Sequence, residues 1–155
     1  MNEMTAEVAA TIDAPAARVY AVLRDYEGGH AAILPPDTFR ELVVLEGGQG
    51  EGTRLRLRME VMGEEVVSEQ VVSEPEPGRV LVETDEKGMS QTTFTVEPAG
   101  ANQARVTIHT ELRTKPGLRG MVERVLTPRL LERVYREELE RLNEYVQRDA
   151  AGGFG

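Results

Sequence analysis

The feature that most constrains the fold is a long amphipathic stretch near the end of the chain, from residue 118 to about residue 148. Its apolar residues recur at intervals of three and four, which is the spacing of one buried stripe on an α-helix. Pro128 interrupts the run, and because proline removes a backbone donor we expect a kink there rather than two separate helices. The stripe consists of Leu118, Met121, Val122, Val125, Leu126, Leu130, Leu131, Val134, Tyr135, Leu139, Leu142, Tyr145 and Val146.

The chain before this helix is dominated by patterns that predict β-strands. Residues 53–62 alternate most clearly, with leucine, methionine and valine on one face and arginine and glutamate on the other, which is typical of a strand with one buried side. Two short helices are predicted between the first two strands, one starting at Pro15 with Asp13 as its cap and one over residues 30–34. Further strands are predicted at residues 7–13, 39–46, 79–85, 89–97 and 104–112, and one more follows the turn after residue 62.

The turn after residue 62 predicts a strand register. Gly63 and the residue after it form a two-residue turn with glycine first, as a type II′ turn prefers. That turn places Ser68 opposite Met59 and Gln70 opposite Leu57, so both polar side chains face the apolar side of the sheet. Buried polar groups need partners, so these two side chains bond each other, a water or a ligand.

Consecutive strands joined by short turns predict an antiparallel meander of about seven strands. Helices on one side of such a sheet make an α+β domain of two layers. We expect a single domain over residues 1–149, followed by a flexible tail at residues 150–155. The glycine-rich residues 47–52 precede a strand rather than a helix and include Glu51, so they predict a plain turn rather than a phosphate site.

The composition argues against several functions. The formal charge of -9 argues against nonspecific binding to nucleic acid and to anionic membranes. The chain has no cysteine and two distant histidines, so we expect neither a metal site nor a cofactor. No apolar run approaches the roughly 18 residues of a membrane span, and no signal peptide is visible. We therefore expect a cytoplasmic protein without integral membrane association.

Three stretches of the chain resemble the START-like superfamily, also called SRPBCC: residues 12–26 (IDAPAARVYAVLRDY), residues 50–54 (GEGTR) and the terminal helix. The sequence is most similar to the small bacterial members grouped as polyketide cyclase/dehydrase and lipid-transport proteins. The resemblance implies a helix-grip, Bet v 1-like fold, in which a curved antiparallel sheet wraps around a long C-terminal helix. It also implies an apolar cavity between sheet and helix, where family members bind lipids, sterols, polyketides or other hydrophobic small molecules.

The first functional hypothesis is that the chain binds or carries such a molecule. Apolar side chains of the sheet and the helix would wall the cavity, and a few polar side chains would orient the ligand. The same residues could instead fill the space as an ordinary core. The apolar set is Leu55, Leu57, Met59, Val61, Phe94, Val122, Val125, Leu126, Leu130 and Val134, and the polar set is Ser68, Gln70, Thr92, Thr110 and Tyr135.

Two other classes of function remain open. A polyketide cyclase, aromatase or dehydratase needs an acid or base facing the cavity, and His30 is the candidate near the cavity mouth. It is a weak one, because a lone histidine in a loop is more often exposed than catalytic, so no catalytic residue is assigned. The third hypothesis is a protein-interaction module, like the co-chaperone or toxin-like relatives in the superfamily. Pairing of sheet edges into a homodimer is also left open.

Overall fold

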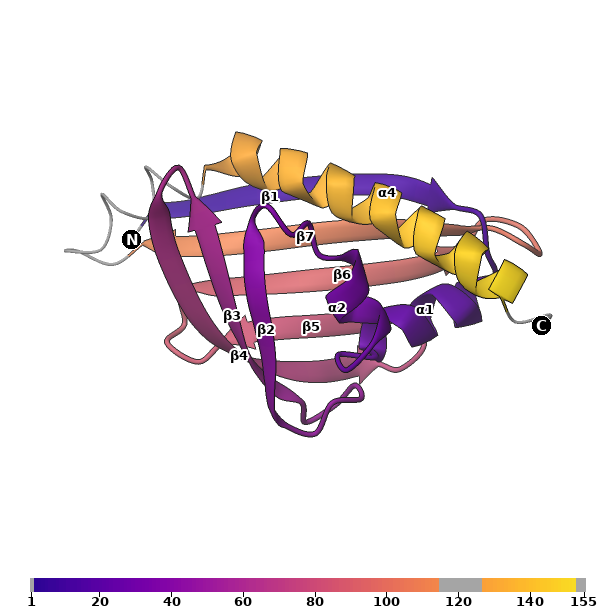
Figure 1. The fold of residues 1–155 in the computed structure, drawn as a ribbon, viewed down its shortest axis with the longest axis horizontal. Helices are drawn as coiled ribbons and strands as arrows, with labels where there is room; N and C mark the ends of the chain where they lie inside the picture. The colour runs from indigo at the N-terminus through magenta and orange to yellow at the C-terminus, as the bar shows by residue number, and fades with distance from the viewer. Residues whose placement is uncertain (1, 115–126, 153–155) are drawn as a thin grey trace.

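The computed structural model describes residues 2–114 and 127–152, which form a curved seven-stranded antiparallel sheet with helices on one face (Figure 1). The strands lie in the order β1-β7-β6-β5-β4-β3-β2, so β1 and β2 are the two edges. The elements are β1 (Asn2–Ile12), α1 (Ala16–Arg24), α2 (Gly29–Ile33), β2 (Phe39–Glu46), β3 (Arg54–Val61), β4 (Glu64–Glu76), β5 (Val80–Asp85), β6 (Ser90–Pro98), β7 (Ala104–Thr114) and α4 (Pro128–Gly152).

The predicted α+β fold, with a meander of strands, two short helices after the first strand and a long terminal helix, is confirmed. β2 has the predicted bounds. β1 begins five residues before the predicted start, at Asn2, because it pairs with β7 along its whole length, from Asn2 opposite Thr114 to Ile12 opposite Ala104. A pairing partner so distant in the sequence is not visible in the local alternation of residues.

The hairpin between β3 and β4 differs from the predicted register. Its two turn residues are Met62 and Gly63, with φ angles of 52° and 81°. Two positive φ angles in succession are the geometry of a type I′ turn rather than a type II′ turn. Ser68 therefore lies opposite Leu57, a shift of two residues. Because side chains alternate with a period of two, Ser68 and Gln70 still face the inner side of the sheet.

The predicted kink at Pro128 is corrected, because α4 begins at this residue. Proline suits the first position of a helix, where its missing N–H has no intrahelical partner to lose. Thr127 caps the helix, since its Oγ1 accepts a hydrogen bond from the Leu130 N–H at 3.2 Å. The predicted helical residues 118–126, including Val122, Val125 and Leu126, lie outside the described part of the chain. At its other end α4 runs to Gly152, past the predicted start of the tail.

The core lies between the inner face of the sheet and the helices. α4 runs alongside β1 and contacts α1 and α2 (Figure 1). Arg141 of α4 donates hydrogen bonds to the backbone oxygens of Ala32 and Ile33, at 3.1 and 3.2 Å, which satisfies carbonyls at the end of α2. The inward stripe of α4 is Leu131, Val134, Tyr135, Leu139, Leu142 and Val146, all buried.

The first helix and the glycine-rich turn are held to each other by the backbone. The Gly50 N–H donates to the Arg24 oxygen at 2.8 Å, and the Tyr26 N–H donates to the Gly48 oxygen at 2.9 Å. A strand follows this turn, as the plain-turn interpretation predicts. The predicted cap of α1 is wrong, because α1 has no side-chain cap bond and the carboxylate of Asp13 accepts from Gln103 Nε2 at 2.9 Å.

Within residues 2–114 and 127–152, no helix combines the length and the hydropathy needed to cross a membrane.

Candidate functional site

A row of polar side chains crosses the inner face of the sheet, and we call it the inner polar row. It is formed by residues of β4, β5, β6 and β7 that face the core. Cross-strand pairing makes them neighbours, because Gln70 lies opposite Asp85, Glu83 opposite Thr92, and Thr92 opposite Thr110. All five side chains are buried. Charged groups are almost never buried without partners, so this row is the first candidate for a functional site.

The carboxylate of Glu83 is the centre of a buried hydrogen-bonded cluster. The Tyr26 hydroxyl donates to Glu83 Oε2 at 2.6 Å, and His30 Nε2 lies 3.4 Å from the same oxygen. Burial and the Glu83 charge raise the pKa of Tyr26 well above its ordinary value, so its hydroxyl keeps the proton and donates it. The carboxylate of Glu83 in β5 is thus contacted by two side chains, Tyr26 from the loop after α1 and His30 from α2.

His30 is buried, with 2% of its surface exposed, which corrects the expectation of an exposed loop histidine. Its Nδ1 lies 2.7 Å from the backbone oxygen of Leu23. Because a carbonyl only accepts, Nδ1 carries a proton and Nε2 is directed to the carboxylate of Glu83. The ring stacks on Tyr26 with centroids 4.4 Å apart and meets the edge of Phe94 at 5.4 Å. These contacts fix the orientation of the imidazole.

Glu138 brings a second acid to the same interior from α4. Its side chain is 2% exposed, and within the described residues its Oε2 has no hydrogen-bond partner. Burial, and after it the negative charge of Glu83, raises the pKa of Glu138 well above its ordinary value. When two buried carboxyl groups interact, they do not both ionise. We call Glu83 and Glu138 the carboxyl pair.

The predicted polar residues Thr92, Thr110 and Tyr135 are brought together as a chain of hydroxyl groups. Thr92 Oγ1 and Thr110 Oγ1 lie 2.8 Å apart, and Thr110 Oγ1 lies 2.5 Å from the Tyr135 hydroxyl. Burial raises the pKa of Tyr135. The chain joins β6 and β7 to α4 and lies beside the carboxyl pair, since Thr92 is opposite Glu83 and Tyr135 is one helical turn before Glu138.

The predicted residues Ser68 and Gln70 do bond each other, with 3.1 Å between Gln70 Nε2 and Ser68 Oγ. Ser68 Oγ in turn donates to Asp85 Oδ1 at 2.8 Å. The remaining oxygen of the amide, Gln70 Oε1, is buried and has no hydrogen-bond partner among the residues that the structure describes. Within the described residues, the inner polar row and α4 thus present two buried oxygen atoms without a hydrogen-bond partner, Gln70 Oε1 and Glu138 Oε2.

The predicted apolar residues of the sheet belong to the core, as does Val134 of α4. Leu130 is only partly buried and packs against that core from its edge. Val122, Val125 and Leu126 lie outside the described residues, so the predicted cavity between sheet and helix stays a prediction. The residues that the structure places in the core are Leu55, Leu57, Met59, Val61, Phe94, Val134 and Tyr135.

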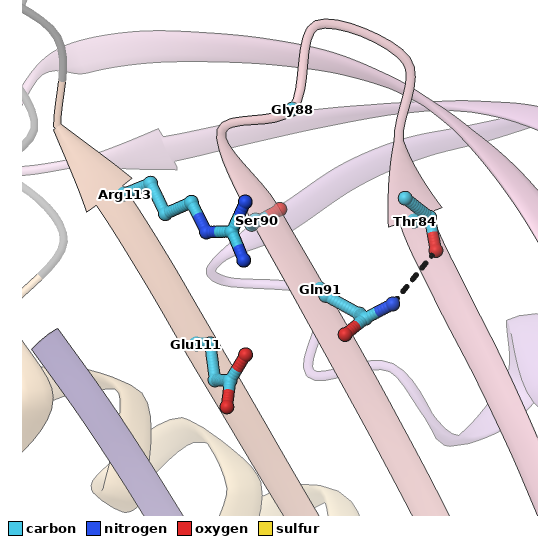
Figure 2. Close-up of a pocket in the computed structure, with 6 residues that line it drawn as sticks. All are labelled: Thr84, Gly88, Ser90, Gln91, Glu111 and Arg113. Atoms are coloured by element: carbon cyan, nitrogen blue, oxygen red, sulfur yellow. Dashed lines mark hydrogen bonds between the residues drawn. The ribbon is translucent and has the colours of Figure 1, made fainter. Parts of the chain in front are cut away.

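The surface also carries hollows away from the inner polar row. One of about 80 Å³ lies on the outer face of the sheet (Figure 2). There the amide Nε2 of Gln91 donates to Thr84 Oγ1 at 3.4 Å, beside Glu111 and Arg113. A second hollow lies beside the first turns of α4, where Leu130 contributes to its wall. Neither contains a residue of the inner polar row, so they do not extend the candidate site.

The sequence interpretation missed both members of the carboxyl pair, although each leaves a signal. Glu83 is two residues from both Leu81 and Asp85 on β5, so all three side chains lie on the same, inner face of the sheet. Glu138 falls within the apolar stripe of α4, one turn after Tyr135. An acid at a stripe position is the signal that could have identified it. Across the described residues, no group of three His, Asp or Glu side chains is arranged to hold a metal ion.

Comparisons with known proteins agree with this geometry. Residues 3–147 match the family model described as polyketide cyclase / dehydrase and lipid transport. None of the curated proteins matches the chain. Among solved structures, the chain is similar to the KanY protein, with 28% identity and a TM-score of 0.81 over 95% of this chain and 99% of that chain.

Two further structures show the same fold. An aromatase/cyclase named Zhui, from Streptomyces sp. R1128, has 24% identity and a TM-score of 0.72, over 96% of each chain. A START superfamily protein from Mycobacterium smegmatis has 16% identity and a TM-score of 0.70, over 93% of this chain and 97% of that chain. The family match covers nearly all of the sequence, and therefore this chain belongs to the polyketide cyclase/dehydrase and lipid-transport family, with a START-like helix-grip fold.

Proposed function

We propose that this protein binds a hydrophobic small molecule in its interior, between the sheet and α4. The observation that carries the proposal is a pair of buried oxygens, Gln70 Oε1 and Glu138 Oε2, that have no hydrogen-bond partner among the described residues and lie in the interior with the apolar core. Leaving a buried polar group without a hydrogen bond costs about 1–3 kcal/mol. Such a cost is typical of a site whose partner is a ligand or a bound water rather than of a packed core.

The proposed wall combines apolar residues with a few oriented polar groups, as in most small-molecule sites. The family to which the chain belongs is described by polyketide cyclisation and lipid transport, which supports an apolar ligand. Glu83 and Glu138 join the residues first predicted. The proposed lining is Leu55, Leu57, Met59, Val61, Phe94, Val122, Val125, Leu126, Leu130 and Val134, with Ser68, Gln70, Thr92, Thr110 and Tyr135 as polar groups.

The test starts with native mass spectrometry of the purified protein, followed by extraction under denaturing conditions. We expect an additional mass that is released on unfolding and is retained on an apolar chromatography column. Leu57→Trp should fill the interior and abolish that mass while the protein stays folded. Arg56 is exposed on the opposite face of β3, so Arg56→Trp adds the same ring outside and should keep the mass. Unfolding of Leu57→Trp alone would instead indicate a packed core and contradict the proposal.

Acid–base catalysis of a cyclase or dehydratase reaction is the second candidate function. It is favoured by the buried contact of His30 Nε2 with Glu83 Oε2 at 3.4 Å. A general base must accept a proton, which an imidazole can do at neutral pH. A carboxylate beside the imidazole stabilises the positive charge that results. His30 would be the proton acceptor and Glu83 would orient and stabilise its charged form. The same interior would then serve both to bind the molecule and to transform it.

The catalytic candidate is tested with His30→Asn. The asparagine amide can still donate to the Leu23 oxygen, as Nδ1 does now, but nothing replaces Nε2. When the extracted molecule and its precursors are incubated with the protein, the variant should bind them and fail to convert them. Conversion at the wild-type rate would remove His30 from the reaction and leave binding as the function.

A further inference from the structure

We propose that Glu138 is a neutral carboxylic acid that donates a hydrogen bond to an acceptor oxygen of the ligand, such as a ketone carbonyl. The interior site would then select apolar molecules that carry a carbonyl group over those that carry an amine. This inference rests on the proposed function, because it assigns a ligand chemistry to the same interior.

The surroundings of Glu138 disfavour its charged form. The side chain is 2% exposed, and no donor among the described residues reaches its Oε2. A carboxylate without donors in an apolar interior costs far more than the neutral acid, so the group keeps its proton. The raised pKa of Glu138, which follows from burial and from the charge of Glu83, agrees with this assignment.

The two members of the carboxyl pair differ in their hydrogen bonds, and this difference decides which of them holds the proton. Glu83 Oε2 accepts from the Tyr26 hydroxyl at 2.6 Å and faces His30 Nε2 at 3.4 Å. The donated hydrogen bond of Tyr26 stabilises an anion, so Glu83 carries the negative charge. Glu138 lacks such donors at Oε2 and lies in the field of that charge, so the proton of the pair resides on Glu138.

The groups around Glu138 come from three other parts of the fold and from its own helix. Glu83 is on β5, Tyr26 follows α1, His30 is on α2 and Tyr135 is on α4. Tyr26 and Tyr135 both have raised pKa values and remain neutral donors. His30 contacts Glu83. The arrangement therefore offers a ligand a neutral O–H donor beside a satisfied anion, which suits a carbonyl oxygen.

The test uses three probes of one shape, measured by isothermal titration calorimetry. They are 2-acetylnaphthalene, with a carbonyl, 2-ethylnaphthalene, without a polar group, and 2-(aminomethyl)naphthalene, a cation. The wild type should bind the ketone roughly three- to tenfold more tightly than the hydrocarbon, the value of one neutral hydrogen bond. Glu138→Gln keeps an N–H donor and should keep that preference. Glu138→Leu should remove that preference, so that the ketone and the hydrocarbon bind with similar affinity.

Each outcome decides between the alternatives. Preferred binding of the amine, lost in Glu138→Gln, would show an ionised Glu138 and overturn the inference. Unchanged ketone preference in Glu138→Leu would also overturn it, while interior binding would stand. Failure of all three probes to bind would count against the proposed function as well.

Infrared spectra of the unliganded protein give a check that needs no ligand. The carbonyl stretch of a protonated carboxylic acid should be present and should vanish in Glu138→Gln, and its absence from the wild type would refute the neutral acid.

Discussion

Replacing Glu138 by leucine is expected to raise the free energy of unfolding. The carboxyl group is buried in the apolar stripe of α4, and its Oε2 has no partner among the residues described. Leucine has nearly the same length and removes the unpartnered oxygen without opening a large cavity. A buried unsatisfied polar group costs about 1–3 kcal/mol, which is therefore the expected gain at neutral pH. For a domain of this size each kcal/mol corresponds to roughly 2–4 °C in Tm.

The gain should depend on pH, with a sign that follows from the raised pKa of Glu138. Burial, and then the charge of Glu83, raises that pKa above its ordinary value of 4.5. Between the ordinary value and the raised one, the folded state holds a proton that the unfolded state has released. Stability of the wild type then falls as pH rises through this interval. Leucine does not titrate, so it contributes no such pH dependence. The gain in free energy of unfolding from Glu138→Leu should therefore be small below the ordinary glutamate pKa and grow as the pH rises above it.

The assay is urea denaturation of both proteins at about pH 4, below the ordinary glutamate pKa, and at about pH 7. Glu137, an exposed acid on the same helix, supplies the control. Glu137→Leu should change the free energy of unfolding by no more than about 0.5 kcal/mol at either pH. A loss of stability in Glu138→Leu, or a gain that does not change with pH, would refute the reasoning. Either result would show that the carboxyl group has a partner in the folded protein.

Three further predictions test other parts of the fold. Tyr26→Phe removes the 2.6 Å donor to Glu83 and should lower the free energy of unfolding by about 1–3 kcal/mol in urea denaturation; a change near zero would show that this bond contributes little. Gly50 and Gly52 both have positive φ, 58° and 88°, but only at Gly50 would a Cβ collide with neighbouring side chains. Gly50→Ala should therefore lower Tm more than Gly52→Ala, and equal losses would mean that backbone strain alone decides. Met62 is exposed with a φ of 52°, so Met62→Asn should stabilise the hairpin by about 0.5–1 kcal/mol in thermal unfolding; a loss would indicate a contact made by the methionine.

The architecture followed from the sequence by itself, because its signals are local. Alternation with a period of two marked the strands, and the three-and-four spacing marked the terminal helix. Short turns between the strands predicted an antiparallel meander, which is the observed order from β2 to β7, whereas the place of β1 beside β7 was not predicted. The same alternation placed Leu57, Thr92 and Thr110 on the inner face of the sheet, where they are buried. Each of these inferences uses residues that are close together in the chain.

The register of the β3–β4 hairpin needed the structure, although it is also local. The choice between two turns one residue apart depends on whether Met62 or Gly63 begins the turn. Glycine at the first position favours a type II′ turn, but the observed turn places both residues at positive φ. Glycine is also favoured at the second position of a type I′ turn, so Gly63 by itself does not distinguish the two registers.

The candidate site was decided by the tertiary structure. His30, Glu83 and Glu138 come from α2, β5 and α4, and no local pattern says which inward side chains meet across a curved sheet. Burial of His30 follows from its bond to the Leu23 oxygen and its stacking on Tyr26. Glu83 and Glu138 stand at inward positions of β5 and α4, but the sequence interpretation missed both. The docking of helices on the sheet determined that Glu83 accepts a hydrogen bond from Tyr26 and that Glu138 Oε2 has no donor among the described residues. Hydrogen bonds between distant segments exist only once the chain has folded.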